Sequence, residues 1–192
     1  TGASAARMAL ERAGLEPEDI GLVIAGGCSP QYLIPAESCM IAAELGIPSA
    51  AFDVNSACSS FAAQMHVLRS MRPESLPDYI LVVNAENTTR TVDYRDRSTA
   101  VLWGDGTSAA VVSARKPSRM RITHTLLHSD PAGWAKVVIK AGGHFGQNGP
   151  AVQAFAIRKT GEIIRELRGH LEGPERWFIG HQANLLMLRS VC

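Results

Sequence analysis

Apolar residues with helical and with strand spacing alternate along this chain. Residues 1–13 carry them at the three- and four-residue spacing of an amphipathic helix, and Gly14 ends that run. Residues 21–25 and 79–84 are short apolar runs without alternation, typical of strands covered on both faces. The same pattern predicts helices over 35–47, 58–71 and 149–171, the first with Pro35 in its first turn and Gly46 at its end. It predicts strands over 49–57, 120–130 and 176–184. Residues 99–114 form two apolar segments around a Gly-Asp-Gly turn. Strands and helices in alternation predict an α/β fold with a mainly parallel central sheet.

Composition narrows the classes of function. The chain has 192 residues, 46% hydrophobic and 19% charged, as in a globular protein with a real core. Nineteen basic residues balance 18 acidic ones, which argues against nucleic acid as a partner. No run of about 18 apolar residues predicts a membrane span. The first and last residues each read as part of a helix, so we expect elements to be missing at both ends.

The four cysteines do not form a metal or redox motif. They stand at positions 28, 39, 58 and 192 without a CxxC pair, so neither a zinc site nor a thioredoxin-like motif is predicted. A cytoplasmic, reduced chain is the simplest interpretation. Cys28 and Cys39 are interpreted as packing residues, and Cys192 at the chain end has no interpretation.

Cys58 has the setting of a nucleophile. It lies in DVNSACSSF, between the small residues Ala57 and Ser59, where an apolar strand runs into a helix. The positive end of a helix favours a thiolate, and its free N–H groups favour a developing oxyanion. The alternative is a small buried core residue.

A thiol nucleophile needs a base or a cation nearby, and His181 is the best candidate among six histidines. It ends the predicted strand RWFIG and precedes QAN. The carboxyl ends of strands in α/β sheets face the crevice where ligands bind.

Three segments in order, DVNSACSSF, LWGDGTSAAVV and GHQANL, resemble the β-ketoacyl-acyl carrier protein synthase III family. The segments AEN, RTVDYRDRST and LHSD are also similar to this family. The resemblance implies a thiolase-like layered αβαβα fold, incomplete at both ends here. It implies an N-terminal half over 1–115, lacking its first elements, and the start of a C-terminal half over 116–192.

The resemblance also implies roles for individual residues. Cys58 matches the acyl-accepting cysteine and His181 the first catalytic histidine. Arg97 falls where a basic residue contacts the nucleotide part of coenzyme A, with a solvated surface arginine as the alternative. Gly104 and Gly106 match a structural turn. Asn184 completes the HQAN signature and is expected to support the loop more than the chemistry.

The chain departs from the family pattern at three places. It stops before the second catalytic residue, an asparagine, and before the glycine-rich strand that completes the oxyanion hole. Leu186 stands where the family often has a basic residue, which weakens a carrier-protein contact there. Ile34 stands in place of a bulky aromatic that limits the acyl tunnel, so we expect a primer longer than acetyl.

The resemblance implies an acyl-CoA-primed decarboxylative condensation with malonyl-acyl carrier protein. Acyl-CoA is a substrate, and no cofactor or metal is expected. Two alternatives are an acyltransferase of secondary metabolism and a catalytically silent partner subunit. We also expect a homodimer, formed through the strand AAFDV beside Cys58.

Overall fold

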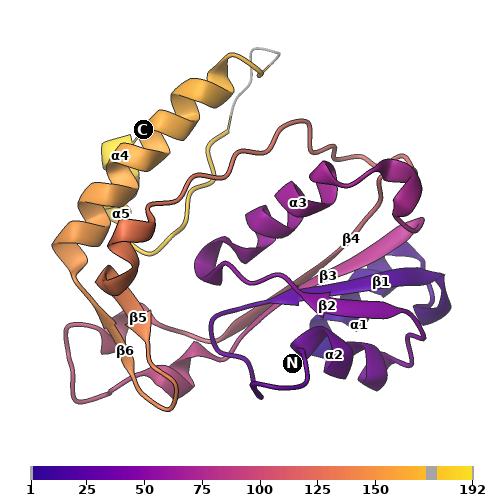
Figure 1. Ribbon diagram of the computed structural model, residues 1–192, viewed down its shortest axis with the longest axis horizontal. Helices are drawn as coiled ribbons and strands as arrows, with labels where there is room; N and C mark the ends of the chain where they lie inside the picture. Colours follow the sequence, from indigo (N-terminus) through magenta and orange to yellow (C-terminus); the bar gives the residue numbers. More distant parts are fainter. Residues whose placement is uncertain (1, 172–176, 192) are drawn as a thin grey trace. The chain divides into compact units, whose positions relative to one another are not determined.

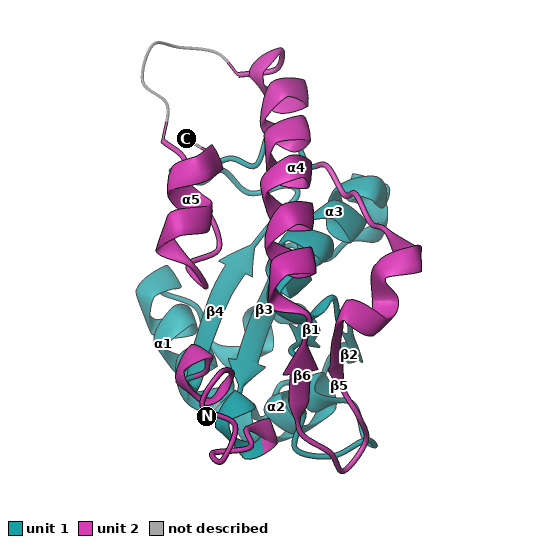
Figure 2. Ribbon diagram, turned by 90° about the vertical axis from the view of Figure 1, so that its left-hand side faces the viewer, with its two compact units in different colours: residues 1–90, 104–125 teal, residues 91–103, 126–192 magenta. Residues whose placement is uncertain are grey.

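The computed structural model describes residues 2–171 and 177–191. The chain forms two compact units, shown in different colours in Figure 2. Unit 1 comprises residues 1–90 and 104–125, and unit 2 comprises residues 91–103 and 126–192. The division into thiolase-like halves at residue 115 stays a prediction.

Unit 1 is built on a four-stranded sheet. Its order is β2 (Ala50–Asp53), β1 (Ile20–Gly26), β3 (Tyr79–Glu86) and β4 (Gly106–Val112). β1 is parallel to both β2 and β3, as the sequence predicts, whereas β4 is antiparallel to β3. The pairing is antiparallel because residues 87–105 loop back to the end of β3, so that β4 starts beside it and Gly106 pairs with Glu86.

Helices cover both faces of this sheet (Figure 1). α1 (Gly2–Ala13) and α2 (Glu37–Leu45) pack on one face, and α3 (Ser60–Ser70) packs on the other. Successive side chains of β1 therefore enter two different cores. Val23 and Ala25 join the cluster under α1 and α2, while Leu22 and Ile24 join the cluster under α3. Burial of each large aliphatic side chain contributes roughly 1.5–3 kcal/mol, which explains why the strand lacks polar alternation.

The start of α2 differs from the prediction. The helix begins at Glu37, whereas Pro35 lies outside it after a cis peptide bond with Ile34. The Asp53 carboxylate at the end of β2 accepts hydrogen bonds from the amide of Glu37 (2.9 Å) and from that of Ser38 (3.0 Å). A cap from a distant strand leaves no local sequence signal, which is why the boundary was misplaced. The end is as predicted, with Gly46 at φ +72°.

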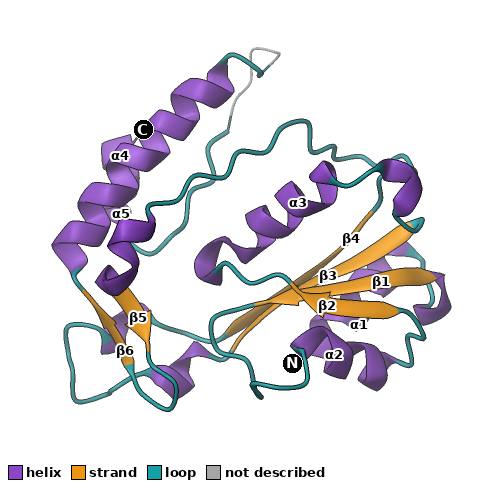
Figure 3. Cartoon of the chain, viewed as in Figure 1, coloured by secondary structure: helices purple, strands orange, loops and turns teal. Residues whose placement is uncertain are grey.

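In its described residues, unit 2 contains a short hairpin and the α-helices α4 and α5 (Figure 3). β5 (Val137–Ile139) pairs antiparallel with β6 (Phe145–Gln147). α4 (Gly149–Arg168) follows as predicted, capped by Asn148, whose Oδ1 accepts from the amide of Ala151 at 3.2 Å. α5 (Leu185–Val191) packs against α4.

Two predicted strands are wrong for the residues described. Residues 120–130 and 177–184 form no ladder with another strand, and residue 176 lies outside the described part of the chain. Both segments have strand-like composition, but a strand also needs a hydrogen-bonded neighbour. The first apolar segment of 99–114 is a single 3₁₀ turn over Ala100–Leu102, and only the second is a strand, β4. Within residues 2–171 and 177–191, no helix is long and apolar enough to cross a bilayer.

Candidate active site

Cys58 lies on a tight turn between β2 and α3. Residues Ala57–Ser59 form one 3₁₀ turn that leads directly into the helix. Ala57 has φ +46°, a left-handed conformation that is uncommon for alanine. The side chain of Asn55 closes the approach to the turn, because its Oδ1 accepts from the amide of Ala57 at 2.8 Å.

Ser60 fixes this turn from inside the unit. The residue is buried, and its hydroxyl donates to the carbonyl of Ala57 at 2.6 Å. The same oxygen accepts from the amide of Ser56 at 3.0 Å. The backbone around Cys58 is therefore held by side chains on both sides of it.

The thiol of Cys58 is free, and the residue is exposed to solvent. Its pKa is nevertheless raised, first because the sulfur is partly desolvated and then because of the negative charge of Glu86. A backbone hydrogen bond at Cys58 lowers the pKa, but it is the smallest of the three causes. The net direction is opposite to the lowered pKa expected from the helix start.

Glu86, at the end of β3, is a residue that the sequence analysis missed. Its carboxylate accepts from the amide of Cys28 (2.9 and 3.1 Å), from the Cys28 thiol (3.2 Å) and from the hydroxyls of Ser29 (3.2 Å) and Thr88 (3.4 Å). Cys28 is thus part of a polar cluster and is not a simple packing residue. Burial, then the hydrogen bond and charge of Glu86, raise its pKa to about 12. Cys39 is exposed, so its interpretation as a packing residue is wrong as well.

Two adjacent glycines, Gly26 and Gly27, allow close packing at the carboxyl end of β1. A Cβ on Gly26 would lie 2.4 Å from the carbonyl oxygen of Val54 and 3.0 Å from the Cβ of Ser60. A Cβ on Gly27 would lie 2.6 Å from the carbonyl oxygen of Ala85 and 3.1 Å from a carboxylate oxygen of Glu86. Both positions therefore require glycine for steric reasons, and the sequence alone does not predict this requirement.

Unit 1 also contains an apolar cavity of about 250 Å³, beside α3 and the strands β3 and β4. Its lining comprises Phe61, Val82, Asn84, Ser108, Ala109 and Ala110. Asn84 donates to the Oε1 of Gln64 at 3.0 Å, while its own carbonyl oxygen is buried without a partner among the described residues. Phe61 follows Cys58 by three positions and so lies one helical turn beyond the thiol.

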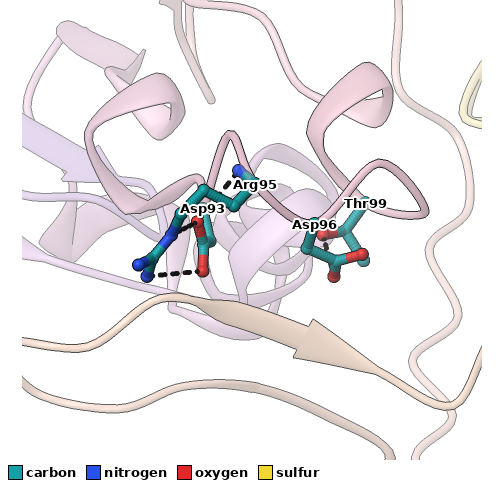
Figure 4. Close-up of polar contacts among 4 residues, drawn as sticks. All are labelled: Asp93, Arg95, Asp96 and Thr99. Carbon is teal, nitrogen blue, oxygen red and sulfur yellow. Dashed lines mark hydrogen bonds and ion pairs between the residues drawn. The ribbon is translucent and has the colours of Figure 1, made fainter.

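Arg97 lies in unit 2, in a turn that Asp96 closes. Asp96 accepts from the hydroxyls of Ser98 (2.6 Å) and Thr99 (2.7 Å), and Figure 4 shows the contact with Thr99. Asp93 pairs with Arg95, with an oxygen–nitrogen distance of 3.0 Å. Arg97 itself is exposed, and its guanidinium has no ion pair or hydrogen bond with residues 2–171 and 177–191.

Ile34 lies on a protruding apolar loop of unit 1. The side chains of Leu33 and Ile34 are 88% and 84% exposed. Arg90 anchors the start of this loop by donating to the carbonyls of Ser29 (2.8 Å) and Pro30 (2.9 Å).

His181 and Asn184 lie in unit 2, and both are exposed. Asn184 precedes α5, and its Oδ1 accepts from the amide of Met187 at 3.0 Å. This contact agrees with the expected role of Asn184 in supporting the loop. Its contact with substrate, and a shared site for His181 and Cys58, stay predictions, because Cys58 belongs to unit 1.

Gly104 and Gly106 lie before and at the start of β4. Neither has a positive φ, and a Cβ on either would meet nothing within 4 Å. Asp105 between them ties this segment to residue 89, because its carboxylate accepts from the amide (2.9 Å) and the hydroxyl (2.8 Å) of Thr89. Among the residues described, no steric contact requires glycine here, and the structural role of the pair stays a prediction.

Comparison with known proteins shows which enzymes this chain is similar to. Residues 52–131, which include Cys58 and Arg97, match the family model of 3-oxoacyl-[acyl-carrier-protein (ACP)] synthase III. The chain is 31% identical to the β-ketoacyl-[acyl-carrier-protein] synthase III of Coxiella burnetii over 97% of its own length. It superposes on the 3-oxoacyl-[acyl-carrier-protein] synthase III of Aquifex aeolicus VF5 with a TM-score of 0.91 and 30% identity, covering all of this chain and 63% of that one. The chain is thus similar to synthase III enzymes over nearly its whole length.

A second solved structure that resembles this chain is of an enzyme from polyketide biosynthesis. The priming β-ketosynthase from the R1128 polyketide biosynthetic pathway has a TM-score of 0.83 and 28% identity, with 100% of this chain and 61% of that one covered. The predicted α/β, thiolase-like fold is therefore confirmed. This synthase III relative spans 61% of the length of the Coxiella protein.

Proposed function

We propose that this synthase III relative carries out an acyl-CoA-primed decarboxylative condensation with malonyl-acyl carrier protein. The observation that carries the proposal is the Cys58 turn, a free and exposed thiol at the start of a helix in a chain similar to synthase III enzymes. The product would be a 3-oxoacyl thioester that begins a fatty acid or a polyketide. No cofactor or metal is part of the proposal.

The first half-reaction loads the cysteine. Because the pKa of Cys58 is raised, its thiol has to give its proton to an acceptor before or during attack on the thioester carbonyl. The carbonyl carbon then bonds to sulfur, and coenzyme A leaves as a thiolate that takes up a proton. The result is an acyl-cysteine.

The second half-reaction forms the carbon–carbon bond. The malonyl thioester loses carbon dioxide, and the electron pair of the broken bond becomes an enolate. His181, together with an asparagine that the family carries after the HQAN segment, donates hydrogen bonds to that enolate. Its carbon attacks the acyl-cysteine, and the sulfur leaves and regains its proton.

Arg97 is the residue proposed to contact the nucleotide part of acyl-CoA. The ion pair with Asp93 occupies Arg95, and the closed Asp96 turn holds the intervening backbone. Arg97, an exposed residue within this turn, is left available to a phosphate, for which a guanidinium is well suited.

Ile34 supports the proposal of a primer longer than acetyl, because it is smaller than the aromatic residue that often stands there. Faster loading from hexanoyl-CoA than from acetyl-CoA is expected, and Ile34→Phe should restore the preference for acetyl-CoA. Equal rates, or faster loading from acetyl-CoA, would argue against a longer primer.

A homodimer and a cytoplasmic location complete the proposal. β2 lies at the edge of its sheet with Phe52 39% exposed, which leaves a strand edge for a second copy. Cys28, Cys39 and Cys58 are free thiols, as expected in a reducing compartment.

The test measures carbon dioxide from carboxyl-labelled malonyl-acyl carrier protein, using the full-length native protein. Release that requires acyl-CoA, with a 3-oxoacyl product, supports the proposal, and His181→Ala should abolish it. Acyl transfer without carbon dioxide would favour the acyltransferase alternative. If the protein neither binds an acyl group nor releases carbon dioxide, the silent-subunit alternative is favoured.

A further inference from the structure

Ser60 is the first residue of α3 and immediately follows the turn that carries Cys58. The residue is 2% exposed. Its hydroxyl donates to the carbonyl oxygen of Ala57 at 2.6 Å and accepts from the amide of Ser56 at 3.0 Å. A serine hydroxyl has one hydrogen to donate and two lone pairs that accept, so both bonds form together. One buried oxygen therefore ties the two residues before Cys58 to the start of the helix.

Ala57 needs this support because its φ is +46°. A residue with a Cβ is unfavourable in the left-handed region and keeps that conformation where its surroundings fix it. The amide of Ala57 donates to the Oδ1 of Asn55 at 2.8 Å, and its carbonyl accepts from Ser60. Asn55 is exposed and Ser60 is buried, so side chains hold Ala57 from the solvent side and from the core side.

These bonds leave one amide of the turn without an acceptor. Four of the amides between residues 56 and 60 donate to atoms of the same segment: those of Ser56, Ala57, Ser59 and Ser60. The amide of Cys58 donates to no other residue in the part of the chain that the structure describes. It is therefore available to the carbonyl oxygen of a thioester that the Cys58 sulfur attacks.

We propose that Ser60 is a positioning residue of the Cys58 site, whose hydroxyl holds the Ser56–Ala57 backbone so that the Cys58 amide stays free and directed at the thioester carbonyl. The inference rests on the proposed function, in which Cys58 attacks an acyl thioester. Ser60 acts through the turn and does not touch the substrate. Because a displacement of about 1 Å can slow a reaction roughly 100-fold, loss of this hydroxyl affects the chemistry without removing a reacting group.

The test compares two reactions of the Cys58 sulfur in the purified full-length protein at one pH. Acyl loading from hexanoyl-CoA develops an oxyanion, whereas alkylation by iodoacetamide displaces iodide from a saturated carbon and develops none. We expect Ser60→Ala to slow single-turnover loading about ten- to hundredfold and alkylation by less than about threefold. The loss should lie in the maximal loading rate, with the half-saturating concentration of hexanoyl-CoA unchanged.

Ser70→Ala is the matched control. It removes a hydroxyl from the other end of α3, where Ser70 donates to the carbonyl of His66 at 2.8 Å. Both rates should equal those of wild type. A hydroxyl that only stabilises the fold would not separate the two reactions, so equal losses in Ser60→Ala, or no loss in either reaction, overturn the proposal.

If Ser60→Ala does not fold, residue-resolved hydrogen exchange in the wild-type protein decides. The amide of Ser56 must be more strongly protected than that of Cys58, and equal protection or the opposite order overturns the proposal. Neither reaction uses malonyl-acyl carrier protein, so a failed condensation assay is a separate result. Wild-type protein that is alkylated at Cys58 but never loaded by acyl-CoA would contradict the proposed function itself, and with it the role of Ser60.

Discussion

Cys28 and Cys58 show how neighbours, more than position in the sequence, determine what a thiol does. Each lies just beyond the carboxyl end of one of two parallel strands, Cys28 after β1 and Cys58 after β2. Cys28 donates to the Glu86 carboxylate and is locked in its protonated form, with its pKa at about 12. Cys58 is exposed on a turn without such a bond to Glu86, which leaves its sulfur free to react.

The raised pKa of Cys28 predicts a loss of stability in alkali. Between about pH 9 and about pH 12 the unfolded chain releases this proton while the folded protein keeps it, so the free energy of unfolding falls as pH rises. Cys28→Ser retains a hydroxyl donor to Glu86 and removes the titrating thiol. The free energy of unfolding of this variant should therefore fall less steeply than that of wild type over pH 8–10.5. Urea unfolding at each pH measures this. Cys39→Ser is the control and should follow wild type, and identical slopes for Cys28→Ser and wild type would contradict the prediction.

The candidate site was only partly predictable at the scale of single residues. Cys58 at a strand-to-helix junction follows from its neighbours in the sequence, because small residues around a cysteine are a local pattern. Glu86 was missed, since its donors Cys28 and Ser29 lie 58 and 57 positions away. The direction of the Cys58 pKa was wrong for a similar reason, because partial burial of the sulfur raises it first, and then the charge of Glu86 from another strand, and both depend on the folded structure.

At the scale of elements, packing at strand ends determines the geometry of the site. β1 ends at Gly26 and Gly27 follows it, because a side chain on Gly26 would meet Val54 and Ser60 and one on Gly27 would meet Ala85 and Glu86. The interior strands β1 and β3 were predictable, since apolar runs without alternation require burial on both faces. The segment 120–130 was not, because its composition is that of a strand but no neighbour pairs with it among the described residues.

A pair of glycine substitutions tests this account of packing. Gly26→Ala should lower the free energy of unfolding by about 1–3 kcal/mol, because the added methyl overlaps the carbonyl oxygen of Val54 at 2.4 Å. Gly104→Ala should change it by less than about 0.5 kcal/mol, because its Cβ would meet nothing within 4 Å. Chemical denaturation of both variants measures the difference. Equal effects would mean that the strand end is less tightly packed than the distances indicate.

At the scale of the whole molecule, β2 provides the test of assembly. We expect the purified protein to sediment as a dimer at micromolar concentration, because the exposed edge of β2 is available for a second copy. Phe52→Asp places a charge on this strand and should shift the protein toward monomer. Met8→Asp, at an exposed apolar position of α1, is the matched control and should remain dimeric. Sedimentation of the wild-type protein as a monomer would remove the proposed interface.

The most direct measurement for the whole account is the position of the acyl group after incubation with acyl-CoA. Intact mass should increase by one acyl group per chain, and peptide mapping should place it on Cys58. Cys58→Ser should show no thioester, whereas Cys28→Ser should be labelled like wild type. An acyl group on Cys28, or undiminished labelling of Cys58→Ser, would contradict the assignment of the nucleophile and with it the proposed reaction.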